Sequence, residues 1–176
     1  MRAPWLPYNP VRTYPERTRE AYVDALAQFQ VETNERYVPW NGRTYCNIFL
    51  WDGTRALCCE IPHWVDENGN GTVPFAKGSR ELSANAIERW LIDHGGRHGW
   101  VKADLPSAKL LAAIGQPVIL QWTNPTGESG HVAFLLPTGD VIQAGKRNGV
   151  MSVGAAFGQR LFTCWTNEGV KHEPHH

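Results

Sequence analysis

Apolar positions in the first two thirds of the chain recur at the three- to four-residue spacing of amphipathic helices. Tyr22, Leu26 and Phe29 share one face of the first such stretch. Thr13, followed three residues later by Glu16, resembles a capping box, in which both side chains bind free N–H groups at a helix start. The pattern therefore predicts a first helix that begins near Thr13.

Three more helices are expected before the pattern changes. Apolar residues repeat at helical spacing from Cys46 onwards through residues 46–59, so Cys46 is expected at or near a helix start. Ser83 can cap a third helix that ends before Gly95. A short fourth helix covers residues 106–114.

The second half of the chain has the pattern of strands. Residues 62–79 are rich in Gly, Asn, Asp and Pro and predict a long surface loop. Later on, short runs of β-branched and aromatic residues lie between turn residues, at 117–122, 131–136, 140–143, 150–153 and 161–165. Helices followed by strands predict an α+β fold, with N-terminal helices packed on one face of a C-terminal antiparallel sheet.

Length and charge limit the classes of function. With 176 residues the chain is expected to form a single domain (1–176), with an extended N-terminal arm (1–12) and a flexible tail (167–176). The 17 basic and 17 acidic side chains give a net charge of zero. Because nucleic acids and anionic membranes attract basic surfaces, neither is an expected partner.

The N-terminus and the cysteines indicate the cell compartment in which the protein is made. No apolar run reaches the roughly 20 residues of a membrane span, and no secretory signal precedes the domain, so we expect synthesis in the cytoplasm without a signal peptide. The four cysteines are expected to be free thiols, and their spacing fits no zinc site: Cys46, Cys58, Cys59 and Cys164.

Cys46 is the first candidate for chemistry. At a helix start, free backbone N–H groups and the helix dipole favour a thiolate, which is the nucleophilic form of cysteine. A buried role is nevertheless the commoner outcome for a single cysteine, so neighbouring groups must decide between the two.

A predicted hairpin supplies those groups. If residues 137–139 form a three-residue loop in which Gly139 adopts the left-handed conformation, His131 pairs with Gly145 and shares a face with Gln143. Gln143 can then orient the imidazole while His131 acts as the base. A two- or four-residue loop would place Gln143 on the opposite face. For His131 alone, a half-buried strand residue bonded to backbone is the alternative.

Several segments together resemble the core of NlpC-type cell-wall peptidases and their CHAP relatives. They are Gly115-Gln-Pro-Val-Ile-Leu-Gln-Trp122, Ser129-Gly-His131-Val-Ala-Phe-Leu-Leu136, Gly139-Asp-Val-Ile-Gln143-Ala, Tyr37-Val-Pro-Trp40-Asn-Gly42 and Tyr45-Cys46-Asn47. In that family a second polar residue follows the base histidine by twelve positions, as Gln143 follows His131. The resemblance covers about residues 37–59 and 115–153 and implies a papain-like fold.

The resemblance also implies an activity. The expected reaction is hydrolysis of an amide bond in peptidoglycan through a thioester on Cys46, by an endopeptidase or an N-acetylmuramoyl-L-alanine amidase. Tyr37 would donate its hydroxyl to the oxyanion beside the backbone N–H of Cys46. The expected partner is cell-wall peptide, bound by a monomer without metal or cofactor. Such a protein resembles phage lysins, or effectors that a secretion machine delivers to the cell wall.

Three more residues are candidates for the cleft. Trp40 and Trp51 flank Cys46 and are expected to shape the substrate-binding cleft, although core packing is the usual role of a large aromatic residue. His63 could line the same cleft or only cap a loop. Two other readings stay open, a papain-like acyltransferase or protein-directed protease, and a wall-binding module without catalysis.

Overall fold

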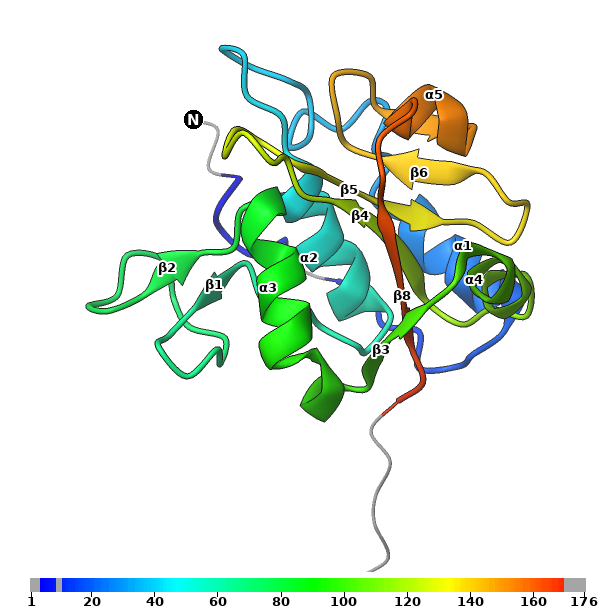
Figure 1. The fold of residues 1–176 in the computed structure, drawn as a ribbon, viewed down its shortest axis with the longest axis horizontal. Coiled ribbons are helices and arrows are strands. Elements are labelled where there is room, and N and C mark those ends of the chain that lie inside the picture. The colour runs from blue at the N-terminus through cyan, green and yellow to red at the C-terminus, as the bar shows by residue number, and fades with distance from the viewer. Residues whose placement is uncertain (1–3, 9–10, 170–176) are drawn as a thin grey trace, which may run out of the picture.

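The computed structural model describes residues 4–8 and 11–169 and has a mixed α+β architecture (Figure 1). The helices are α1 (Arg19–Ala27), α2 (Cys46–Ala56), α3 (Ala84–Asp93), α4 (Leu105–Ala113) and α5 (Val153–Phe157), with a 3₁₀ turn at Gly95–His98. The strands are β1 (Trp64–Val65), β2 (Arg80–Glu81), β3 (Trp100–Ala103), β4 (Val118–Trp122), β5 (His131–Leu135), β6 (Val141–Gln143), β7 (Gly149–Met151) and β8 (Thr163–Asn167).

Six of these strands form one sheet, in the order β3-β8-β4-β5-β6-β7. Every neighbouring pair in it is antiparallel, which confirms the predicted kind of sheet. The two short strands β1 and β2 form a separate antiparallel pair that projects beside α3 (Figure 1). This pair lies within and just after the stretch 62–79, where only a loop was expected.

Side chains cap the starts of α1 and α3, whereas the start of α2 has no side-chain cap. Helix α2 begins at Cys46 and α3 is capped by Ser83, whose side chain accepts a hydrogen bond from the N–H of Ala86, as predicted. The prediction for α1 was wrong, because Thr18 and not Thr13 is its N-cap and accepts from the N–H of Ala21. Both threonines offer a hydroxyl, and the sequence does not show which one stands where the helix turns begin.

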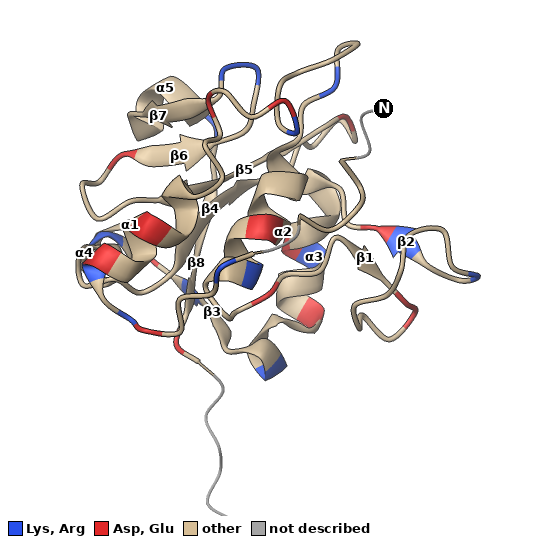
Figure 2. Cartoon of the chain, turned by 180° about the vertical axis from the view of Figure 1, so that it is seen from behind, with Lys and Arg blue, Asp and Glu red and all other residues tan. Residues whose placement is uncertain are grey.

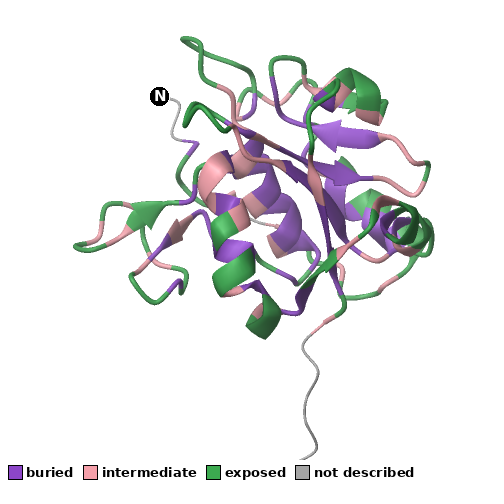
Figure 3. Ribbon diagram, viewed as in Figure 1, coloured by how far each residue is buried: buried purple, intermediate pink, exposed green. Residues whose placement is uncertain are grey.

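Helices cover both faces of the sheet. Because side chains alternate along β5, Phe134 lies on the face against which α1, α2 and α3 pack. The ring of Phe49 in α2 lies 5.5 Å from the Phe134 ring, measured between centroids. The other face carries His131, whose ring lies 5.2 Å from Phe157 of α5, and α4 packs along β8, β4 and β5. The expectation that helices cover one face alone is corrected, because β4 and β6 are buried on both sides (Figure 3).

Two further expectations need correction. Strand β3 precedes α4, so the helices do not all come before the strands of the sheet. Asn167 is a buried residue of β8 and does not belong to a tail, while residues 170–176 of the expected tail lie outside the described residues. Of the expected arm, Tyr8 packs against Phe29 at 5.4 Å between ring centroids.

The surface agrees with the neutral composition. In the view of Figure 2, basic and acidic residues are interspersed over the elements. All four cysteines are free thiols, as predicted. Within the described residues, no helix is long and apolar enough to cross a membrane.

Candidate active site

The hairpin between β5 and β6 has the register that the sequence predicts. Phe134 pairs with Ile142 and Leu135 with Val141, and the turn contains Gly139 at a φ of 89°. Continuing this register sets Gly145 opposite His131, and a Cβ placed on Gly145 would lie 3.3 Å from the His131 ring. The three-residue loop therefore puts His131 and Gln143 on one face.

The side chains of His131 and Gln143 are hydrogen-bonded. His131 Nε2 lies 2.5 Å from Gln143 Oε1, and the amide nitrogen of Gln143 donates to the backbone carbonyl of Arg147 at 3.0 Å. Because an amide oxygen only accepts, Nε2 of the imidazole carries the proton and Nδ1 keeps a lone pair. Gln143 thus fixes both the ring orientation and the tautomer that a general base requires.

Burial governs the protonation of His131. Its desolvation lowers the pKa of His131 below that of an ordinary histidine, the positive charge of Arg160 lowers it further, and the hydrogen bond with Gln143 raises it. The ring is therefore neutral at neutral pH. A neutral imidazole is the form that can accept a proton from a thiol.

Cys46 is a buried thiol at the first residue of α2, with 4% of its surface exposed. Burial raises the pKa of Cys46, while hydrogen bonds from the backbone N–H groups of Val132, Asn47 and Cys46 itself lower it. The helix start therefore does not produce a thiolate in this state, contrary to the expectation, because desolvation outweighs the N–H groups. A base must remove the proton.

The backbone on either side of His131 lies close to Cys46, whereas the His131 ring lies on the sheet face opposite α2 and does not line the cavity. The thiol lies at the backbone N–H of Val132, the residue that follows His131, and Gly130 on the other side lines the same cavity as Cys46. Within the described residues no direct hydrogen bond joins the thiol to the imidazole. Such contacts are often long before substrate binds and shorten in the reacting complex.

A cavity of about 900 Å³ opens over Cys46. Trp40 lines it together with the cysteine, as predicted, and so does His63, for which this was one of two predicted roles. Trp40 is 57% exposed there and therefore free to contact a ligand. Cavities of this size hold small molecules or short peptides.

Trp51 does not line this cavity. Its indole Nε1 donates to Glu60 Oε1 at 2.8 Å, and its ring packs on His63 with 5.2 Å between centroids. The expectation of a direct role in the cleft is corrected for Trp51, because residue 51 lies more than one helical turn beyond Cys46. Its contact with His63 makes it a supporting residue.

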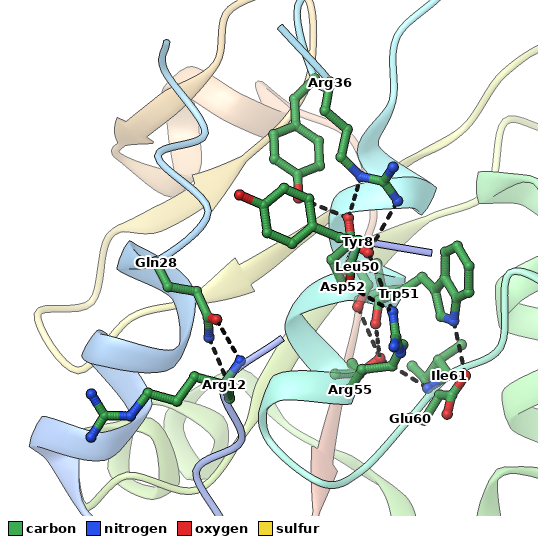
Figure 4. A network of polar contacts seen from close by, with 12 residues as sticks. Tyr8, Arg12, Gln28, Arg36, Leu50, Trp51, Asp52, Arg55, Glu60 and Ile61 are labelled. Carbon is green, nitrogen blue, oxygen red and sulfur yellow. Dashed lines mark hydrogen bonds and ion pairs between the residues drawn. The ribbon is translucent and has the colours of Figure 1, made fainter. Parts of the chain in front are cut away.

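Tyr37 is also absent from the cavity lining. It is fully buried, and its hydroxyl donates to Asp52 Oδ2 at 2.7 Å. The same carboxylate forms an ion pair with Arg36, which Figure 4 shows. Burial, together with the charge of Asp52, raises the pKa of Tyr37. The expected oxyanion role is thus corrected, because this hydroxyl ties the segment before α2 to the helix.

Asn47 and Glu81 also line the cavity, and neither was predicted as a site residue. Asn47 and Glu81 are hydrogen-bonded to each other at 3.0 Å, and Glu81 also binds His63 Nε2 at 2.9 Å. Glu81 belongs to β2, which is 34 residues from Asn47 along the chain. No local pattern marks the contact, although Asn47 directly follows the candidate nucleophile.

No metal centre accompanies these groups in the part of the chain that the structure describes, where no three His, Cys, Asp or Glu residues are placed to hold an ion. Comparison of the chain with protein-family models, with curated proteins and with solved structures finds no match. The functional conclusion therefore rests on the geometry of Cys46, His131 and Gln143.

Proposed function

We propose that the chain is a cysteine hydrolase that cleaves an amide bond in peptidoglycan, with Cys46 as nucleophile, His131 as base and Gln143 as the positioning residue. The observation that carries this proposal is the hydrogen bond between His131 Nε2 and Gln143 Oε1. It leaves Nδ1 as the proton acceptor, beside a strand start that also meets the Cys46 thiol.

The chemistry proceeds in two steps. His131 accepts the proton of Cys46 as the sulfur attacks the amide carbonyl carbon, and the same proton then passes to the departing amine as the thioester forms. Water, deprotonated by His131, attacks the thioester carbon and releases the carboxylic acid, so that the thiol is restored. The backbone N–H of Cys46, which meets the thiol of the same residue before substrate binds, is the proposed donor to the oxyanion.

A papain-like fold of the NlpC type belongs to the same proposal. Its support is the order of the elements, in which a helix that begins with cysteine precedes an antiparallel sheet, and the histidine and glutamine stand on adjacent strands β5 and β6. The substrate class, peptidoglycan peptide, is proposed from the resemblance of the segments around Cys46, His131 and Gln143 to that family.

Digestion of purified sacculi tests the activity. Wild-type protein is expected to release soluble peptides and one new amine for each bond that is cut, and mass spectrometry of the quenched reaction is expected to find an acyl group on Cys46. The Cys46→Ala variant is expected to release none. Release of new amines without any acyl group on a cysteine would leave the proposed mechanism without support.

A second cysteine provides a matched control. Cys58 is exposed, lies outside the cavity and has a φ of 55°, a conformation that asparagine tolerates. The Cys58→Asn variant should therefore keep full activity. If wild-type protein binds sacculi but releases nothing, the domain is a wall-binding module. If it cleaves only proteins, or transfers the acyl group to an amine, the proposed substrate or acceptor is wrong.

A further inference from the structure

Glu81 places one open carboxylate oxygen in the cavity beside the candidate nucleophile. Both of its side-chain hydrogen bonds, from Asn47 Nδ2 at 3.0 Å and His63 Nε2 at 2.9 Å, end on Oε1. In the described part of the chain no hydrogen bond reaches Oε2, and the side chain remains 49% exposed. The carboxylate is thus held in one orientation with its second oxygen available to a ligand.

No lysine or arginine forms an ion pair with Glu81 within the described ranges. His63 Nε2 lies at hydrogen-bond distance from Glu81, and His63 Nδ1 is buried without a hydrogen-bond partner among the described residues. Arg43 lines the same cavity, and its positive charge favours the ionised form of Glu81. The hydrogen bond from His63 is the largest influence that lowers the pKa of Glu81, so the group is ionised at neutral pH.

Aromatic rings line the same cavity as this carboxylate. Trp5, Trp40 and Phe75 are all exposed, and the Trp64 ring lies 4.7 Å from that of Phe75 between centroids. The faces of aromatic rings attract cations, and tryptophan attracts them most strongly. A carboxylate with one open oxygen among exposed rings is suited to an organic cation better than to an anion or a purely apolar group.

We propose that Glu81 is a specificity-determining residue that binds a primary ammonium group of the peptide whose amide bond Cys46 attacks. This inference rests on the proposed function for its substrate. It adds a requirement that hydrolysis alone does not make, namely a free amine close to the scissile bond. Asn47 connects the two sites, since it directly follows Cys46 and binds the Glu81 carboxylate.

Binding to the Cys46→Ala protein tests this requirement without turnover. The probes are N-acetyl-alanyl-lysine amide and the same compound with its side-chain amine acetylated, titrated by calorimetry. Acetylation is expected to weaken binding about tenfold, which corresponds to about 1.4 kcal/mol. In the Cys46→Ala, Glu81→Gln double variant, the two probes are expected to bind within about twofold of each other, because glutamine keeps an acceptor oxygen for Asn47 and His63 but loses the charge.

Glu67→Gln in the same Cys46→Ala background is the matched control. Glu67 is an exposed carboxylate outside the cavity lining, so its loss changes the net charge equally and should leave the tenfold preference intact. Equal binding of both probes to the protein with Glu81 intact would overturn the inference, whatever the double variant does. A preserved preference in a protein that releases nothing from sacculi would instead refute the proposed hydrolysis and leave ammonium binding established.

Discussion

Replacing Tyr37 by Phe separates a structural hydroxyl from a catalytic one. The hydroxyl donates at 2.7 Å to Asp52 Oδ2, which also accepts from Arg36 Nε at 2.7 Å. Hydrogen bonds to charged groups contribute about 1.5–3 kcal/mol. Phenylalanine keeps the ring that packs edge-on against Phe29 and Phe49, so only this bond is lost. The expected loss of unfolding free energy is about 2 kcal/mol, since Asp52 keeps its ion pair.

Urea denaturation and peptide-release kinetics measure the two consequences. The midpoint should fall with an unchanged dependence on urea, and a chain of this length should lose about 4–8 °C in Tm. The kcat/KM of the folded Tyr37→Phe protein should stay within about twofold of wild type. Loss of an oxyanion donor would lower kcat by about 100- to 1000-fold. A decrease of that size in protein with a native circular dichroism spectrum would refute the structural assignment of Tyr37.

Three further predictions concern the pair of strands and the thiol. Gln143→Ala should lower kcat/KM at least about tenfold. In wild-type protein the hydrogen bond with Gln143 raises the pKa of His131, so its loss should lower this pKa and move the acid limb of the kcat/KM profile to lower pH. An acid limb that moves to higher pH would contradict this prediction. Gly139→Ala should lower the free energy of unfolding by about 1–2 kcal/mol, because the φ of Gly139 is 89° and no atom lies near the added Cβ. The control Gly154→Ala, in α5, should be neutral or stabilising. Equal urea midpoints for the two variants would argue against backbone strain in the turn. Without substrate, iodoacetamide should alkylate Cys46 more slowly than free cysteine at neutral pH, because burial raises the pKa of Cys46, and the rate should increase as the pH rises. Mass spectrometry of peptides measures this rate, and alkylation of Cys46 faster than that of free cysteine at neutral pH would contradict the prediction.

Features that depend on a few consecutive residues could be predicted from the sequence. Ser83 caps α3 through a local side-chain bond, and the helical spacing of apolar residues from Cys46 onwards marks the start of α2. The hairpin is the clearest case. Gly139 fixes a three-residue loop, the loop fixes the register, and the register sets His131 and Gln143 on one face.

The sequence could not decide between two positions that carry the same local signal. Thr13 and Thr18 both precede the apolar face of α1, and Thr18 is the one whose side chain caps the helix. Burial is a similar case, since the free N–H groups at Cys46 are a local property, while the desolvation that raises its pKa comes from the elements packed around it.

The sequence by itself determined the α+β class, the helix-start position of Cys46 and the shared face of His131 and Gln143. Only the tertiary structure decided that Tyr37 binds Asp52 inside the molecule and that Glu81 enters the cavity beside Asn47. The physical reason is the distance along the chain between the residues that interact. Capping and hairpin register follow from bonds between near neighbours in the chain, whereas burial and contacts between distant segments depend on how all the elements pack together.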